Sequence, residues 1–125
     1  MKANPVGWFE IYVRDLQRAR KFYETVFETE LKSLSSPYPG IELLAFDMTM
    51  DNYGCAGALV EMAAGPSGGN GTLVYFSCQD CAVEEKRAAA AGGKVEKPKM
   101  SIGEYGFISL VRDPDGNMIG LHSMQ

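Results

Sequence analysis

Two short segments decide the fold: YVRDL at residues 12–16 and SCQDC at residues 77–81. Each follows a run in which residues alternate between two faces, a pattern typical of a β-strand, and each precedes a helix-like run. Asp15 and Asp80 are predicted helix N-caps, because a carboxylate can accept hydrogen bonds from the unpaired N–H groups of a first helical turn. The same strand-to-helix junction therefore occurs twice, 65 residues apart.

The elements that surround these junctions repeat in the same order. Each half is predicted to contain a strand, a helix and then three strands. The predicted strands are 8–13, 31–34, 41–48, 57–61, 72–78, 94–97, 106–112 and 118–122, and the helices follow Asp15 and span 81–91. This order predicts an α+β protein with a first βαβββ module at residues 4–63 and a second at 72–125. The Gly-rich run at 64–71 is the expected linker. Because neither half can bury both faces of its sheet alone, we expect one domain over residues 1–125.

The composition restricts the class of protein. The chain has 125 residues, of which 46% are hydrophobic, and a net charge of −4, which disfavours non-specific nucleic-acid binding. No apolar run approaches the ~20 residues of a membrane span. The first predicted strand follows residues 1–5 directly, leaving no room there for a signal segment, so we expect a cytoplasmic protein with no membrane partner. Three cysteines do not suggest a disulfide framework.

The strand at residues 8–13 has two different faces. Positions 9, 11 and 13 are purely apolar and are expected to pack under the helix. The opposite face carries Trp8, Glu10 and Tyr12, which suits a partly polar pocket. The following helix has one predicted apolar stripe, formed by Leu16, Ala19, Phe22, Tyr23, Val26 and Phe27.

Two motifs carry a resemblance to a known family. VRDLQRARKFY at residues 13–23 and RDPDGN at residues 112–117 resemble segments of the vicinal oxygen chelate superfamily. This superfamily includes glyoxalase I, the bleomycin-resistance proteins and the extradiol dioxygenases. The resemblance implies two modules that form a curved, mixed half-barrel sheet around a cleft. It also implies a homodimer, because a partner subunit often completes the cleft in these proteins.

The resemblance also implies where a metal would be bound. Metal-bearing members supply one ligand from the first strand and one from the last strand of each module. Those positions correspond here to Trp8 and Leu73 in the first strands and to Gly57 and Gly120 in the last strands. None of these side chains can coordinate a metal. We therefore expect no metal and no other cofactor, unless a two-residue shift of the alignment brings Glu10 and His122 into ligand positions.

Two residues are candidates for acid–base chemistry. Glu10 lies within an apolar strand, where a carboxylate can acquire a raised pKa and act as a general acid or base. The alternative is a structural carboxylate bonded to a cross-strand Tyr or Arg. His122, the single histidine, lies on the same strand face as Gly120. It is either a proton donor or a ligand-binding group, or an ordinary histidine at the rim of the cleft.

The remaining candidates concern binding and thiol chemistry. Tyr75 occupies the repeat position of Glu10, and the expected ligand-binding set is Trp8, Glu10, Tyr12, Tyr75 and His122. The C-x-x-C pair Cys78 and Cys81 is interpreted as structural, with Cys78 packed against the helix. The leading hypothesis is a metal-free protein that binds a small apolar or aromatic molecule, like the bleomycin-resistance proteins. The alternatives are a glyoxalase-type lyase or isomerase using Glu10 or His122, and a non-catalytic sensor or scaffold.

Overall fold

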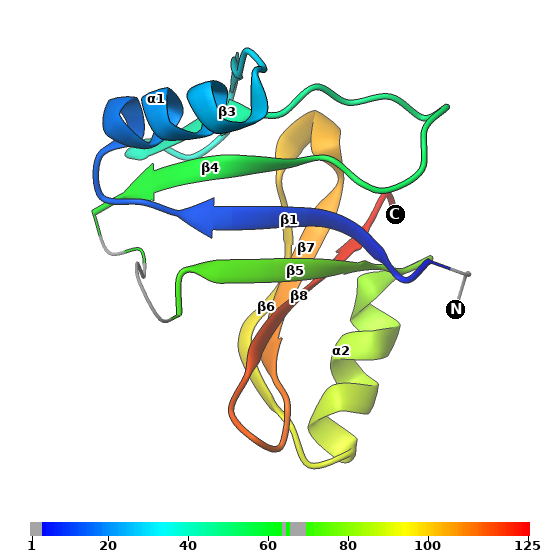
Figure 1. The fold of residues 1–125 in the computed structure, drawn as a ribbon. Helices are drawn as coiled ribbons and strands as arrows, with labels where there is room; N and C mark the ends of the chain where they lie inside the picture. The colour runs from blue at the N-terminus through cyan, green and yellow to red at the C-terminus, as the bar shows by residue number, and fades with distance from the viewer. Residues whose placement is uncertain (1–3, 64, 66–69) are drawn as a thin grey trace. The chain divides into compact units, whose positions relative to one another are not determined.

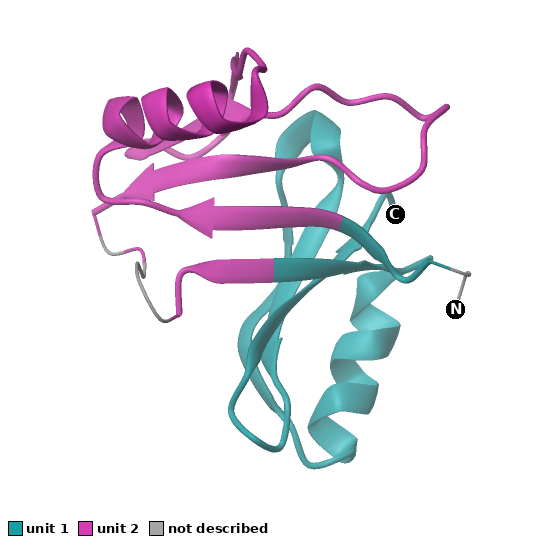
Figure 2. Cartoon of the chain, in the orientation of Figure 1, with its two compact units in different colours: residues 1–7, 74–125 teal, residues 8–73 magenta. Residues whose placement is uncertain are grey.

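The computed structural model describes residues 4–63, 65 and 70–125. The chain forms two compact units (Figure 2): residues 8–73, here called the N-terminal unit, and residues 1–7 with 74–125, the C-terminal unit. These units divide the chain close to the two predicted modules. Most of the expected linker at 64–71 lies outside the described residues.

The N-terminal unit has one helix on a four-stranded sheet (Figure 1). Its elements are β1 (Val6–Tyr12), α1 (Leu16–Phe27), β2 (Lys32–Leu34), β3 (Ile41–Ala45) and β4 (Gly57–Met62). The strand order is β2-β3-β4-β1, with β1 and β4 parallel and the other neighbours antiparallel. Asp15 caps α1 by accepting a hydrogen bond from the Arg18 N–H, as the sequence predicts.

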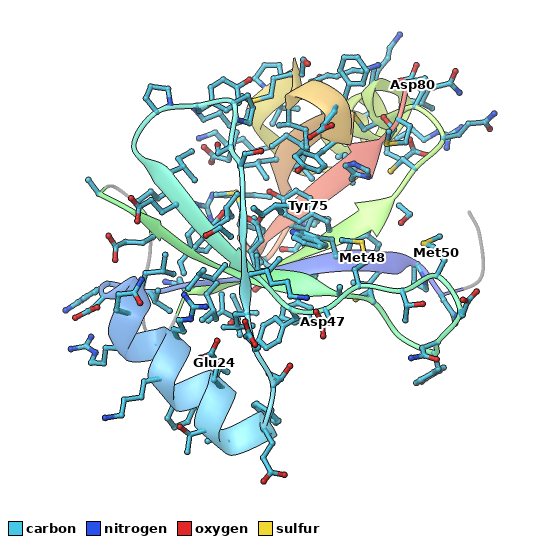
Figure 3. The ribbon with its side chains drawn as sticks, turned by 90° about the horizontal axis from the view of Figure 1, so that it is seen from above. Glu24, Asp47, Met48, Met50, Tyr75 and Asp80 are labelled. Carbon is cyan, nitrogen blue, oxygen red and sulfur yellow. The ribbon has the colours of Figure 1, made fainter. Side chains whose placement is uncertain are left out.

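The carboxylate of Glu24 connects the segment after α1 to the helix by a hydrogen bond. Glu24, labelled on α1 in Figure 3, accepts hydrogen bonds from the Leu31 N–H (2.8 Å) and from Arg20 Nε (3.0 Å). The Leu31 N–H, followed by Arg20, holds the pKa of Glu24 below its ordinary value. Leu31 is thereby fixed in the core under α1, where it is fully buried with Leu59.

The C-terminal unit repeats this arrangement. Its elements are β5 (Thr72–Ser77), α2 (Cys81–Ala90), β6 (Lys94–Ser101), a 3₁₀ turn η1 (Gly103–Tyr105), β7 (Phe107–Arg112) and β8 (Met118–Ser123). The strand order is β5-β8-β7-β6, with β5 and β8 parallel. The Asp80 carboxylate caps α2 by accepting from the Ala82 N–H. The α+β class and the repeated βαβββ order are confirmed.

The sheet covers only part of the predicted apolar stripe on α1. Ala19 and Tyr23 pack against the core, whereas Phe22, Val26 and Phe27 are 59%, 52% and 63% exposed. Consecutive helical residues point about 100° apart, so Phe22 cannot share the direction of Tyr23. The sequence pattern overestimated how much of the helix surface the sheet covers.

Replacing Glu28 with Gly is expected to stabilise the N-terminal unit. Glu28 ends α1 in a left-handed conformation with φ of 49°, which an L-residue adopts at some cost and glycine adopts freely. We expect Glu28→Gly to raise the free energy of unfolding by about 1 kcal/mol in urea titrations. Glu30→Gly removes a nearby acidic group without changing the helix end and is the matched control. An equal gain in both variants would contradict the explanation.

A second prediction concerns the turn between β7 and β8. The Asp113 carboxylate accepts hydrogen bonds from the Asn117 side chain and from the N–H groups of Asn117 and Asp115, all at 2.9 Å. These bonds, the Asn117 side chain first, lower the pKa of Asp113 below its ordinary value of 3.8. A lowered folded pKa stabilises the protein above pH 3.8, and this contribution is lost as the pH falls through the folded pKa.

Asp113→Asn is therefore expected to lower stability at pH 7 and to approach the wild type below pH 3.8. Urea titrations over this pH range measure the difference. Asp115→Asn, in the same turn, is the matched control. A constant difference between Asp113→Asn and the wild type down to acid pH would contradict the prediction.

Candidate functional site

Three side chains of β1 form a hydrogen-bonded group on one face of the N-terminal sheet. Trp8 Nε1 donates to Glu10 Oε2 at 3.1 Å, and the Tyr12 hydroxyl donates to Glu10 Oε1 at 2.7 Å. They meet because residues two apart on a strand point to the same side. The prediction that these three residues share a face is confirmed. Two neighbours on its own strand, Trp8 and Tyr12, donate to Glu10.

The Trp8–Glu10–Tyr12 group stands on an apolar surface. Trp8 and Tyr12 pack against the buried residues Ala58 and Val60 of β4, on the sheet face turned away from α1. Two neutral donors thus hold both carboxylate oxygens of Glu10 in place beside hydrocarbon. A small-molecule site usually combines a mostly apolar surface with a few polar groups that are held in place.

A groove of about 770 Å³ lies near the Tyr12 end of this group within the N-terminal unit, although Trp8, Glu10 and Tyr12 are not among the residues that line it. The loop before β3, including Tyr38, and the chain at the end of β4, including Met62, line it. Gly65 also lines the groove and lies against the Tyr12 ring, since a Cβ there would be 3.2 Å from Tyr12 Cδ1. The groove was not predicted, because it depends on how two loops meet rather than on a residue pattern.

The C-terminal unit carries the other two candidates. Tyr75 is 5% exposed and lies over Gly120, its partner in the parallel pairing of β5 and β8. His122 is paired with Ser77, two residues further along the same strands. Its Nε2 is 2.6 Å from the Tyr105 carbonyl oxygen, and because a carbonyl only accepts, Nε2 carries the proton.

The four positions to which the resemblance assigns metal ligands can be checked one by one. The Trp8 indole is bonded to Glu10, and Leu73 is a buried apolar side chain. A Cβ on Gly120 would overlap the Tyr75 ring, whose Cγ would lie only 2.8 Å away. No oxygen, nitrogen or sulfur ligand is therefore presented at these three positions.

The fourth position needs a correction. Phe9 pairs with Gly57, and the Phe9 ring contacts Phe46, which packs against the core under α1. Gly57 thus lies on the α1 face, and Ala58 shares the face of Trp8. The alignment of the two halves is off by one residue here, but alanine offers no metal ligand either.

The side chains at these positions consequently do not fit the metal of the related proteins. Within residues 4–63, 65 and 70–125, no three His, Cys, Asp or Glu side chains are grouped as a metal site requires. No step of the function proposed below uses a metal.

The cysteine pair behaves as part of the core. Cys81 is buried in the cluster under α2, and Cys78 packs against it. Burial, with a smaller contribution from Glu84, raises the pKa of the Cys78 thiol to about 11. A reactive thiol needs the opposite shift, so the structural interpretation of this pair is supported.

Known proteins resemble this chain in sequence and fold. The proteins named "Putative glyoxylase CFP32" of Mycobacterium tuberculosis and Mycobacterium bovis are each 27% identical over 117 residues, which is 92% of this chain and 44% of the relative. The chain therefore spans less than half the length of these curated relatives.

None of the helices in the described part of the chain is long and apolar enough to cross a membrane.

Solved structures show the same fold at low identity. A methylmalonyl-CoA epimerase of Streptomyces coelicolor matches with a TM-score of 0.69 and 19% identity, over 95% of this chain and 96% of that one. The methylmalonyl-CoA epimerase of Mycobacterium tuberculosis matches with a TM-score of 0.68 and 16% identity, over 100% and 93%. The family model described as Glyoxalase/Bleomycin resistance protein/Dioxygenase superfamily matches residues 6–121. The chain belongs to this superfamily.

Proposed function

We propose that this chain binds a small apolar or aromatic molecule without using a metal. The observation that carries the proposal is the Glu10 carboxylate, held by Trp8 and Tyr12 on an apolar sheet face. The groove near the Tyr12 end of this group offers room for a molecule of drug-like size. Tyr75 and His122 are proposed as the equivalent contact residues of the C-terminal unit.

The acceptor oxygens of Glu10 suggest which ligands are preferred. Both oxygens accept hydrogen bonds, from Trp8 and Tyr12, so this face offers acceptors that favour neutral or cationic donors over anions. The net charge of −4 acts in the same direction at longer range. Aromatic amines and aromatic carboxylates of matched size are therefore an informative pair of probes.

Binding can be followed through Trp8, the single tryptophan of the chain. We expect aromatic amines to change its fluorescence and raise the melting temperature, and the matched carboxylates to do so more weakly. Absence of any response across such a set would contradict the proposal.

Replacing Glu10 with Gln is expected to weaken amine binding about tenfold, which corresponds to about 1.4 kcal/mol. Gln keeps the shape of the side chain but removes its charge and converts one acceptor into a donor, which then faces the Trp8 or Tyr12 donor. Fluorescence titration measures the dissociation constant. Tyr53→Phe, at a fully exposed tyrosine, is the control. Equal affinities of the wild type and Glu10→Gln would place the site elsewhere.

The alternatives lead to different observations. A glyoxalase-type lyase or isomerase would show catalytic turnover, and Glu10→Gln or His122→Gln would abolish it. Separately, finding a stoichiometric metal in the purified protein would overturn the proposal that binding uses no metal. A scaffold would respond to no small molecule.

We also propose that the chain forms a homodimer.

A further inference from the structure

The His122 ring lies on the sheet face of the C-terminal unit that is turned away from α2. Leu121 belongs to the buried cluster under α2, so the next residue, His122, points to the opposite face. Strand pairing places Ile108 of β7 and Ser77 of β5 next to His122, and Tyr75 one pair further along the same face. Tyr75 is buried and Ile108 is half-buried, so Ser77 is the polar neighbour in a largely apolar setting.

One hydrogen bond fixes which nitrogen of the His122 ring carries the proton. Nε2 donates to the Tyr105 carbonyl oxygen at 2.6 Å, so the neutral ring is protonated at Nε2. In this tautomer Nδ1 has a lone pair and no hydrogen, so it can only accept a hydrogen bond. Among the residues that the structure describes, none donates a hydrogen bond to Nδ1. The fold therefore leaves this half-buried acceptor without a donor of its own.

Each unit thus presents an acceptor on the sheet face turned away from its own helix. In the N-terminal unit the acceptor is the Glu10 carboxylate, which Trp8 and Tyr12 hold by donating to it. In the C-terminal unit the acceptor is Nδ1 of His122, and Tyr105 orients the ring through its other nitrogen. A neutral imidazole has no net charge, so it distinguishes ligands by their hydrogen-bond donors rather than by their charge.

We infer that His122 determines the specificity of the proposed site by accepting, at Nδ1, a hydrogen bond from an N–H or O–H group of the ligand. Binding displaces water from Nδ1, and an acceptor that then finds no donor costs free energy. A site built around such a group rejects an analogue that lacks the donor. Aromatic molecules with a primary amine meet this requirement, and their tertiary counterparts do not. The inference rests on the proposed function and adds its hydrogen-bonding requirement.

Aniline and N,N-dimethylaniline are the probes that test the inference. Both are neutral aromatic amines at neutral pH, but only aniline has N–H groups to donate. We expect the full chain to bind aniline about tenfold more tightly than N,N-dimethylaniline in NMR titrations, which are suited to weak ligands.

Two substitutions of His122 separate its two nitrogens. His122→Gln can place an amide N–H where Nε2 donates to Tyr105, but it removes the acceptor Nδ1. We expect the preference for aniline to fall from about tenfold to about equal affinity in this variant. His122→Asn can place an amide oxygen near the position of Nδ1, so it is expected to keep most of the preference. Glu104→Gln, at an exposed residue next to Tyr105, is the matched control and is expected to keep all of it.

The wild-type chain offers a direct measurement as well, because His122 is its single histidine. Nitrogen NMR distinguishes a protonated imidazole nitrogen from one that carries a lone pair. We expect the proton on Nε2 in the free chain, and a shift of the Nδ1 resonance when aniline is added but not when N,N-dimethylaniline is added. A proton on Nδ1, or an Nδ1 resonance that aniline leaves unchanged, would overturn the inference even if His122→Gln failed to fold.

The outcomes separate this inference from the proposed function. Aniline binding with an undiminished preference in His122→Gln would overturn the role of His122 and leave the proposed function intact. In that case Glu10→Gln, which alters the other acceptor, is the variant expected to lose the preference. Absence of binding by both probes would overturn the inference, and the proposed function would fail with it only if the wider set of aromatic ligands also gave no response.

Discussion

Gly120→Ala is expected to lower the free energy of unfolding by about 3 kcal/mol, at the upper end of the usual cost of overpacking. Gly120 pairs with Tyr75 across β8 and β5, and the Tyr75 ring occupies the place where a side chain on residue 120 would begin. Because Tyr75 is 5% exposed, its ring cannot swing out into solvent without leaving the core. Urea unfolding followed by circular dichroism measures the loss.

The contact with Tyr75 can be separated from general glycine effects. Gly116 has a positive φ of 87°, and no atom lies within 4 Å of the place that a Cβ on it would take. Gly116→Ala therefore costs only backbone strain, about 1 kcal/mol. In a Tyr75→Ala background the loss caused by Gly120→Ala is expected to disappear, giving a large coupling energy in a double-mutant cycle. An unchanged loss in that background would show that Tyr75 is not the obstacle.

The same pair bears on the metal position that the resemblance assigns to residue 120. A carboxylate at residue 120 would need the volume that the Tyr75 ring fills, so a side-chain ligand there would require two changes rather than one. The ring also supplies apolar surface to the face that carries His122.

The elements of the fold were predictable from local signals. Asp15 and Asp80 cap the helices because their carboxylates meet first-turn N–H groups, and this depends only on neighbouring residues. The alternation along β1 correctly separated Glu10 from the helix-facing side chains for the same reason.

The errors arise where a prediction depends on how elements meet. The periodicity of α1 assigned Phe22 and Val26 to the same apolar stripe as Ala19, but it could not show that the sheet covers only part of this surface. The repeat alignment could not show that β1 pairs Phe9 with Gly57, which turned one proposed ligand position toward the helix. The groove beside Tyr12 depends on two loops for which the sequence offers no periodic signal.

The second large effect on stability is expected from a substitution of Gly57, the residue that pairs with Phe9. A Cβ on Gly57 would overlap the Phe9 carbonyl oxygen and lie 2.7 Å from Cγ and Cδ1 of the Phe9 ring. The ring can rotate, but the carbonyl belongs to the backbone of the neighbouring strand. We therefore expect Gly57→Ala to force β1 and β4 apart and to lower the free energy of unfolding by about 3 kcal/mol or more.

The consequence should reach the proposed site, because Glu10 pairs with Ala58 immediately beside this contact. Displacing β1 would change how Trp8 and Tyr12 hold the Glu10 carboxylate, so Trp8 fluorescence of the folded variant should shift together with its stability. Gly54→Ala, three residues earlier, has a positive φ of 98° but no neighbouring atom, and is expected to cost about 1 kcal/mol without changing the fluorescence. Equal behaviour of the two variants would mean that β1 and β4 are not held by this close backbone approach.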